Sequence, residues 1–102
     1  MNTQKLTGMI GLALRARQAV TGMDACRIMI EAGRCGVLLM DGGAGVHTRK
    51  KCETLCSRTG TPMTILPDGF LEKATGHTGA VLAMQKGSFA EQVTTDCLHT
   101  DS

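Results

Sequence analysis

Residues 21–40 read TGMDACRIMIEAGRCGVLLM, and this stretch predicts a helix followed directly by a buried strand. Thr21 and Asp24 form a Thr-x-x-Asp pattern, which is typical of a helix start because the two side chains cap free backbone amides. Residues 36–40 form an unbroken apolar run, which favours a central strand buried on both faces. Between them, apolar side chains recur at helical spacing until Gly33, which fits the helix end; they are Ala25, Ile28, Met29 and Ala32.

The segments around this stretch continue the alternation of helices and short apolar strands. Upstream, residues 6–16 have helical spacing and residues 18–21 suit a short strand. Downstream we expect a helix capped by Thr48 and ended by Gly60, a strand at 63–66, a short helix at 70–76, a strand at 80–84 and a last helix begun by a Ser88–Glu91 capping box. This order predicts a three-layer α/β/α sandwich, with one domain over residues 1–98 and a frayed polar tail at 99–102.

Length and composition exclude several classes of protein. The chain has 102 residues, 42% of them hydrophobic, and a formal net charge of +2, which suits one compact domain. Its two aromatic residues, Phe70 and Phe89, are too few for an RNA-binding sheet that stacks several bases on aromatic rings. No apolar run approaches the ~20 residues of a membrane span, and the N-terminal apolar residues are too spaced for a signal peptide. We therefore expect a cytoplasmic protein without a membrane partner.

Few residues indicate catalysis or cofactor binding. The five cysteines include no C-x-x-C pair, and their odd number argues against a disulfide framework. Cys52 and Cys56 would share one helical face and with His47 would supply three metal ligands, but reduced cysteines are more often buried core residues. The glycine-rich loop at 42–45 is more often a plain strand-to-helix connection than a phosphate cradle. We expect no enzyme activity, no metal and no cofactor.

Positive charge is concentrated in the first part of the chain. Residues 1–60 hold nine basic and four acidic side chains, whereas residues 61–102 hold two basic and five acidic ones. Such asymmetry suits a phosphate-bearing partner, although from charge alone solvated helix faces are the more common explanation. The helix that starts after Thr21 offers unpaired amides, and Gly22 would let a backbone approach them. Asp24 has two candidate roles at this helix start, capping and RNA contact.

Two longer stretches carry a family resemblance. Residues 6–22 read LTGMIGLALRARQAVTG, and residues 23–53 read MDACRIMIEAGRCGVLLMDGGAGVHTRKKCE. They resemble the bacterial YlxQ-type RNA-binding proteins of the ribosomal protein L-seven-Ae / L-thirty-e / Gadd-type superfamily, and the likeness runs from about Lys5 to Val93. The matching positions are Gly11 to Ala13, Arg15, Ala16, Gly22, Ala32, Gly33, Val37 to Met40, Thr48 to Lys51, Leu71, Ala74, Gly76, Phe89 and Ala90.

The resemblance implies a fold and a function. The fold would be an α/β/α sandwich with a single mixed four-stranded sheet, and the function would be binding of structured RNA, typically kink-turns, in a ribosomal or other ribonucleoprotein setting. The start of the second helix and the loop after the fourth would grip the RNA. The family motif Gly-x-Asn-Glu-x-x-Lys falls here on Gly22, Asp24, Ala25 and Ile28, so its glycine alone is shared. The candidate RNA-binding residues are Arg15, Arg17, Thr21, Gly22, Met23, Asp24, Arg27, Arg34, His77, Thr78 and Gly79.

Two other functions stay open at this point. The differences from the family motif, together with the apolar Met23 and Ile28, favour a protein–protein contact or self-association on the same fold, and an exposed Ile28 would add weight to it. An enzyme would need a nucleophile paired with a base, and the sequence pairs none. RNA binding by shape, through phosphates and 2′-hydroxyls, is the prediction that we carry forward.

Overall fold

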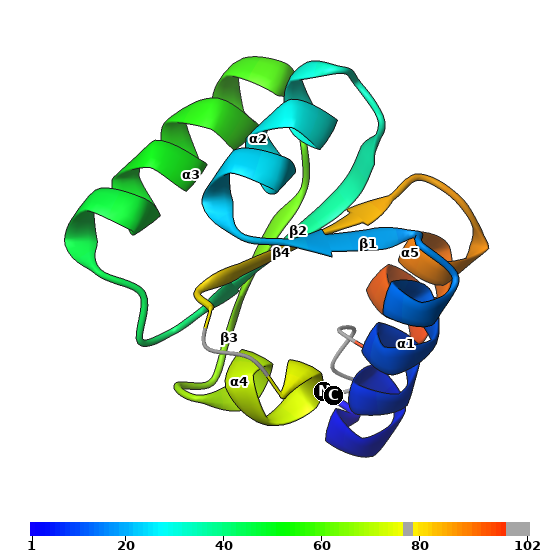
Figure 1. Ribbon diagram of the computed structural model, residues 1–102. Coiled ribbons are helices and arrows are strands. Elements are labelled where there is room, and N and C mark those ends of the chain that lie inside the picture. The colour runs from blue at the N-terminus through cyan, green and yellow to red at the C-terminus, as the bar shows by residue number, and fades with distance from the viewer. Residues whose placement is uncertain (77–78, 98–102) are drawn as a thin grey trace.

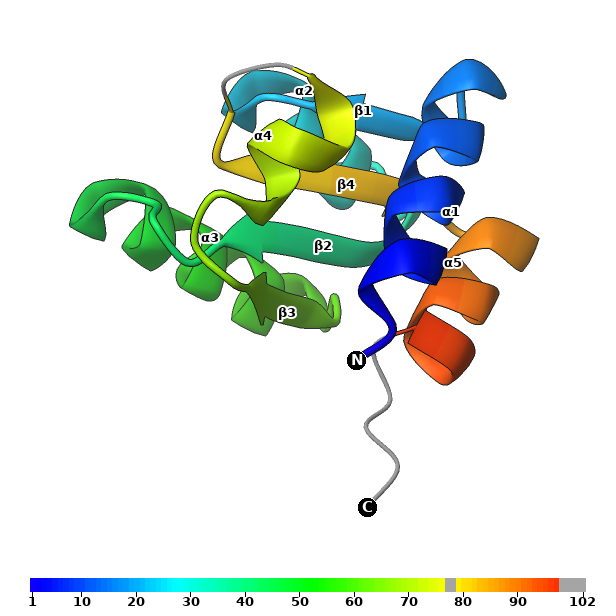
Figure 2. The same cartoon turned by 90° about the horizontal axis from the view of Figure 1, so that it is seen from below.

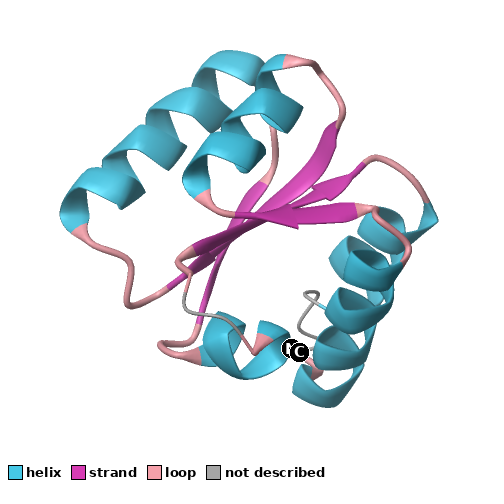
Figure 3. Ribbon diagram, viewed as in Figure 1, coloured by secondary structure: helices cyan, strands magenta, loops and turns pink. Residues whose placement is uncertain are grey.

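A four-stranded sheet separates two layers of helices (Figures 1 and 3). The structure is a computed structural model and describes residues 1–76 and 79–97. The elements follow in the order α1 (Thr3–Arg15), β1 (Ala19–Thr21), α2 (Met23–Glu31), β2 (Cys35–Asp41), α3 (Val46–Thr59), β3 (Met63–Leu66), α4 (Phe70–Thr75), β4 (Val81–Gln85), α5 (Ser88–Gln92) and a π-helical turn, η1 (Val93–Cys97). The predicted three-layer α/β/α sandwich is confirmed.

The sheet is mixed, with strand order β1-β4-β2-β3. Strand β4 runs antiparallel to both β1 and β2, and β3 runs parallel to β2. This topology gives the sheet two ends with different neighbours. At the "Thr21 end", β1 and β2 finish at Thr21 and Asp41 while β4 begins at Val81. At the "Gln18 end", β1 and β2 begin while β4 finishes at Gln85.

Each face of the sheet has its own core. Helices α1, α4 and α5 cover one face, and α2 and α3 cover the other (Figure 1). Along β2, Val37 and Leu39 belong to the first core, whereas Leu38 and Met40 belong to the second. All four side chains are fully buried, as expected for a central strand covered by helices on both sides. The prediction from the apolar run at 36–40 is therefore confirmed.

The predicted capping boxes are wrong. Glycines stand at the N-cap positions of α2, α3 and α5, and none of these caps makes a side-chain hydrogen bond. Thr21 is held in the sheet opposite Leu82, so its hydroxyl does not cap α2 and the chain turns at Gly22, which has a φ of 91°. Helix α3 begins at Val46, two residues before the predicted Thr48 cap. Strand pairing and tight glycine turns therefore override local capping preference.

The inward face of α2 also differs from the prediction. Cys26, Met29 and Ile30 are buried, whereas Ile28 is 60% exposed. The residues expected to face inward lie on a neighbouring side of the helix. The expectation left out Cys26, although cysteine is commonly buried. In α3, by contrast, the expectation that Cys52 and Cys56 are buried core residues is confirmed, and Leu55 is buried beside them.

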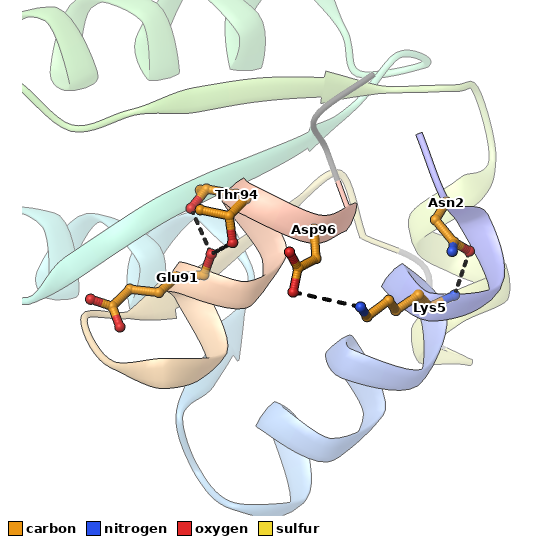
Figure 4. Close-up of polar contacts among 6 residues, drawn as sticks. Asn2, Lys5, Glu91, Thr94 and Asp96 are labelled. Atoms are coloured by element: carbon orange, nitrogen blue, oxygen red, sulfur yellow. Dashed lines mark hydrogen bonds and ion pairs between the residues drawn. The ribbon is translucent and has the colours of Figure 1, made fainter. Parts of the chain in front are cut away.

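The N-terminal helix is fastened to the end of the described chain. Lys5 forms an ion pair with Asp96 at 3.5 Å, and the Asn2 side chain caps α1 by accepting from the Lys5 amide at 3.1 Å (Figure 4). The Asn2 amide also donates to the Cys97 carbonyl at 3.0 Å. Helix α1 consequently lies beside α5 and η1 (Figure 2). The polar tail predicted at 99–102 lies outside the described residues.

Candidate functional site

The start of α2 lies beside the segment that leads into β4, at the Thr21 end of the sheet. The Gly22 amide donates to the Val81 carbonyl at 3.3 Å, and Gly79 lies two residues before Val81 in the chain. The two segments that the family resemblance implies are thus brought together. His77 and Thr78, which belong to the same predicted loop, lie outside the described residues.

The residues at the start of α2 have distinct structural roles. Gly22 is required by its positive φ of 91° and not by crowding, since a Cβ there would have no neighbour within 4 Å. The Asp24 side chain is 96% exposed and pairs with Arg27 at 3.8 Å across one helical turn. Met23 is half-buried, and its sulfur accepts from the Cys52 thiol at 3.7 Å. Thr21, Gly22 and Asp24 are therefore presented to solvent, while Met23 anchors α2 to α3.

Three of the predicted phosphate contacts lie at the other end of the sheet. Arg15 ends α1, Arg17 lies in the connection from α1 to β1, and Arg34 lies in the connection from α2 to β2. Backbone hydrogen bonds join two of these connections to the end of β4, because the Gln85 amide donates to the Gln18 carbonyl and the Lys86 amide donates to the Arg34 carbonyl. The structure consequently separates these arginines from the start of α2 by the length of β1 or of α2, and they do not form one site with Gly22.

A groove between α2 and α3 contains basic residues that the sequence did not assign to the site. Its volume is about 520 Å³, and it opens on the outer side of the two helices. Its charged and titratable lining residues are Arg27, Lys50, Lys51 and Arg58, the carboxylates Asp24 and Glu31, and His47. Four side chains with full positive charges therefore face two carboxylates. The basic run from Thr48 to Lys51 was visible in the sequence. That Lys50 and Lys51 lie opposite Arg27 depends on the packing of α3 against α2.

The charges in this groove are only partly paired. Arg58 pairs with Glu31 at 3.2 Å, and Arg27 pairs with Asp24 at 3.8 Å. Within the described ranges 1–76 and 79–97, no carboxylate lies within ion-pair distance of Lys50 or Lys51. Both lysines are exposed. The middle of the groove is therefore a positively charged surface next to the start of α2.

The glycine-rich loop is occupied by a carboxylate of the chain itself. Buried Asp41 accepts from the amides of Gly43 at 2.9 Å, Gly69 at 3.1 Å and Leu71 at 3.3 Å. Burial raises the pKa of the Asp41 carboxyl, but the hydrogen bonds from these amides outweigh burial and hold the pKa below its ordinary value. The Gly42 amide donates to Leu66 at 2.7 Å. Asp41 thus fastens the loop to the start of α4, and these amides are not directed at an outside phosphate.

The five cysteines are buried and reduced. Cys26, Cys35, Cys52 and Cys56 all lie in the core between the sheet and helices α2 and α3. Burial raises the pKa of Cys26 to about 12 and that of Cys56 to about 11, which disfavours the thiolate that nucleophilic or metal chemistry needs. Across the described part of the chain, no three His, Cys, Asp or Glu side chains are grouped to hold a metal ion.

Comparison with known proteins identifies the fold. A protein of unknown function from Bacillus halodurans is 27% identical, and the match covers 88% of this chain and 93% of that one with a TM-score of 0.80. The Giardia lamblia 15.5kD RNA binding protein is 13% identical, with 88% of this chain and 78% of that one covered and a TM-score of 0.72. The chain therefore shares its α/β/α sandwich fold with both of these proteins.

The other searches add no family assignment. No protein-family model matches the sequence, and no curated protein matches it. Among the described residues, the structure has no helix with the length and apolar character of a membrane span.

Proposed function

We propose that this chain binds structured RNA through the groove between α2 and α3 and the adjoining Thr21 end of the sheet. The observation that carries the proposal is the pair of exposed lysines, Lys50 and Lys51, in a groove where four cations face two carboxylates. Phosphate groups are the partners that such a surface attracts, and the attraction supplies a large share of nucleic-acid affinity. The fold shared with the Giardia RNA binding protein supports the same partner class.

Recognition would depend on RNA shape. Phe70 and Phe89, the two aromatic residues, are partly buried against the first core, on the face of the sheet opposite the groove. Arginine and lysine side chains at the groove would contact phosphates, and the exposed backbone around Gly22 would approach the RNA closely. Folded RNA with a bent backbone presents phosphates and 2′-hydroxyls in a fixed arrangement, which is the kind of target that this surface can read. A kink-turn, ribosomal or other, is the first target to test, because the family resemblance implies it.

The test is a binding titration with two labelled hairpins, one with a kink-turn and one with the same loop fully paired, each at two salt concentrations. Each lost phosphate contact lowers the slope of log K against log salt by roughly 0.7 to 0.9. We expect the double variant K50Q/K51Q to lose affinity and about 1.5 of that slope. The matched control is K5Q/K73Q, because Lys5 and Lys73 lie on α1 and α4, on the opposite face.

The outcomes separate the general proposal from the finer one. Tight binding to the kinked hairpin alone would support kink-turn recognition, while equal binding to both would limit the function to RNA binding through the basic groove. A flat salt dependence of the wild-type protein, or equal losses in K50Q/K51Q and K5Q/K73Q, would contradict the proposal.

A protein contact is the second candidate function, and exposed Ile28 favours it. Its side chain is 60% exposed on the outer face of α2, at the position where the family motif has lysine. One substitution distinguishes the two candidates, because Ile28→Lys places a cation at a largely exposed position outside both cores. Under the RNA proposal, Ile28→Lys should raise RNA affinity by roughly three- to tenfold, as expected for one added phosphate contact. If the wild-type protein self-associates through Ile28, light scattering should give a lower mass for Ile28→Lys than for the wild type, close to that of a monomer.

A further inference from the structure

Three connections of the chain bring together, at the Gln18 end of the sheet, basic residues that do not line the groove. The Gln85 amide donates to the Gln18 carbonyl at 2.7 Å, and the next amide, that of Lys86, donates to the Arg34 carbonyl at 2.8 Å. Arg17 precedes Gln18 in the chain. The Lys86 backbone therefore lies between those of Arg17 and Arg34, about one strand spacing from each. Figure 1 shows the three connections, α1–β1, α2–β2 and β4–α5, at the same end of the sheet.

The three side chains carry unpaired positive charge. Arg17, Arg34 and Lys86 are exposed, and no carboxylate in the described part of the chain lies within ion-pair distance of them. Glu31, at the same end of the sheet, is paired with Arg58 at 3.2 Å. Glu91 and Lys86 line a small hollow of about 260 Å³ without forming an ion pair.

The surface beside these cations is open to an extended ligand. A hollow of about 490 Å³ lies between the ends of α2 and α3. Its charged lining residues are Lys86, which is unpaired, and Glu31, whose charge is paired with Arg58. The other side of the hollow carries two hydroxyls. Thr59 donates to the Leu55 carbonyl at 2.8 Å and accepts from Thr61 at 2.8 Å, so both oxygens are left as acceptors for a ribose hydroxyl. Small residues let a ligand approach this surface, since Gly33 and Gly60 also line the hollow and a Cβ at either would have no neighbour within 4 Å. Cations, hydroxyls and accessible backbone are the groups that contact sugar and phosphate.

The backbone of Arg17 supplies an independent observation. Its φ is 60°, and it is the one non-glycine residue with positive φ in the described part of the chain, where glycine occupies the six other such positions. An arginine in this conformation is strained relative to glycine, and such outliers cluster at functional sites. The chain therefore carries a charged side chain at a turn where glycine would meet the backbone requirement at lower cost.

We propose that Arg17, Arg34 and Lys86 bind the phosphates of a second RNA segment, so that one domain holds two segments at once. The inference rests on the proposed function and extends it to a surface outside the groove. The nine residues of α2 separate its two ends by about 14 Å. Two strands or helical arms of one folded RNA would therefore contact the domain at the groove and at the Gln18 end.

The experiment compares two triple variants that each lose three positive charges. R17N/R34Q/K86Q removes the cations at the Gln18 end, and asparagine suits the positive φ at position 17. R27Q/K50Q/K51Q removes cations of the groove. Each variant and the wild-type protein are titrated against a long kinked hairpin and against a short stem-loop that covers only one surface, over a range of salt. Circular dichroism checks that each variant is folded, and the single variants R34Q and K86Q replace the triple variant if it is not.

With the long hairpin, we expect R17N/R34Q/K86Q to bind at least tenfold more weakly than the wild type. Its slope of log K against log salt should be smaller in magnitude by roughly 2. The wild-type protein should also join two differently labelled stem-loops in one complex, and either triple variant should lose the second stem-loop. If R17N/R34Q/K86Q keeps the wild-type affinity and slope while R27Q/K50Q/K51Q loses both, the Gln18 end does not bind RNA, although the proposed function stands. If the wild-type protein binds neither RNA, the proposed function fails and this inference fails with it.

Discussion

Replacement of Asp41 by asparagine is expected to lower the free energy of unfolding by about 3 to 5 kcal/mol. The Asp41 Oδ2 atom accepts from the amides of Gly43 at 2.9 Å and Gly69 at 3.1 Å, and Oδ1 accepts from Leu71 at 3.3 Å. An asparagine oxygen in place of Oδ2 would keep two bonds without the charge, each weaker by roughly 1 kcal/mol. Its amide NH₂ would then face the buried Leu71 amide and leave that donor unpaired, at a cost of roughly 1 to 3 kcal/mol.

Urea denaturation followed by circular dichroism measures this effect, because the chain has no tryptophan to report by fluorescence. The control is Asp68→Asn, which makes the same chemical change at an exposed aspartate in the connection between β3 and α4. An exposed substitution of this kind should stay within about 0.5 kcal/mol of wild type. If Asp41→Asn also stays within that margin, or if both variants are destabilised equally, the hydrogen bonds of Asp41 do not stabilise the fold as proposed.

The same hydrogen bonds to Asp41 predict that stability depends on pH. Hydrogen bonds hold the pKa of Asp41 below its ordinary value of 3.8, so the folded state binds its proton less readily than the unfolded state. The contribution of the carboxylate is therefore complete above that ordinary pKa and is lost as the pH falls through the lower pKa of the folded protein. The gap in stability between wild type and Asp41→Asn should be constant near neutral pH and should narrow below about pH 4. A gap that stays constant down to pH 2 would contradict this reasoning.

Three further predictions follow from local geometry. Gly36→Ala should destabilise the fold by about 1 to 3 kcal/mol in the same urea assay, because its Cβ would lie 2.7 Å from the Ala90 Cβ; an unchanged midpoint would show that α5 can move. Arg17→Gly should be more stable than Arg17→Ala by about 1 kcal/mol, and equal stabilities would remove the argument from strain. Cys26, with its pKa raised to about 12, should react with iodoacetamide on the order of 100-fold more slowly in the native protein than in urea, and a fast native reaction would show that its core opens.

The fold was largely predictable because its main signal is local. The apolar run at 36–40 has one stable environment, a strand covered on both faces, and the helical spacing on either side supplies the layers that cover it. The ends of these elements were less predictable. Thr21 looks like a helix cap in the sequence, but its pairing with Leu82 keeps it in the sheet. Capping is worth roughly 1 kcal/mol, so strand pairing and burial can override it.

The candidate site was predictable only in part, because a surface is assembled from segments that are distant in the chain. The sequence by itself determined three layers of secondary structure, a basic first half and too few aromatic rings for base stacking. The tertiary structure decided which charges act together, since helix packing places Lys50 and Lys51 across a groove from Arg27. It also moved Arg17 and Arg34 to the opposite end of the sheet, beside Lys86. Sequence fixes the number of charges, but Coulomb attraction depends on their separation in space, and only the fold sets that separation.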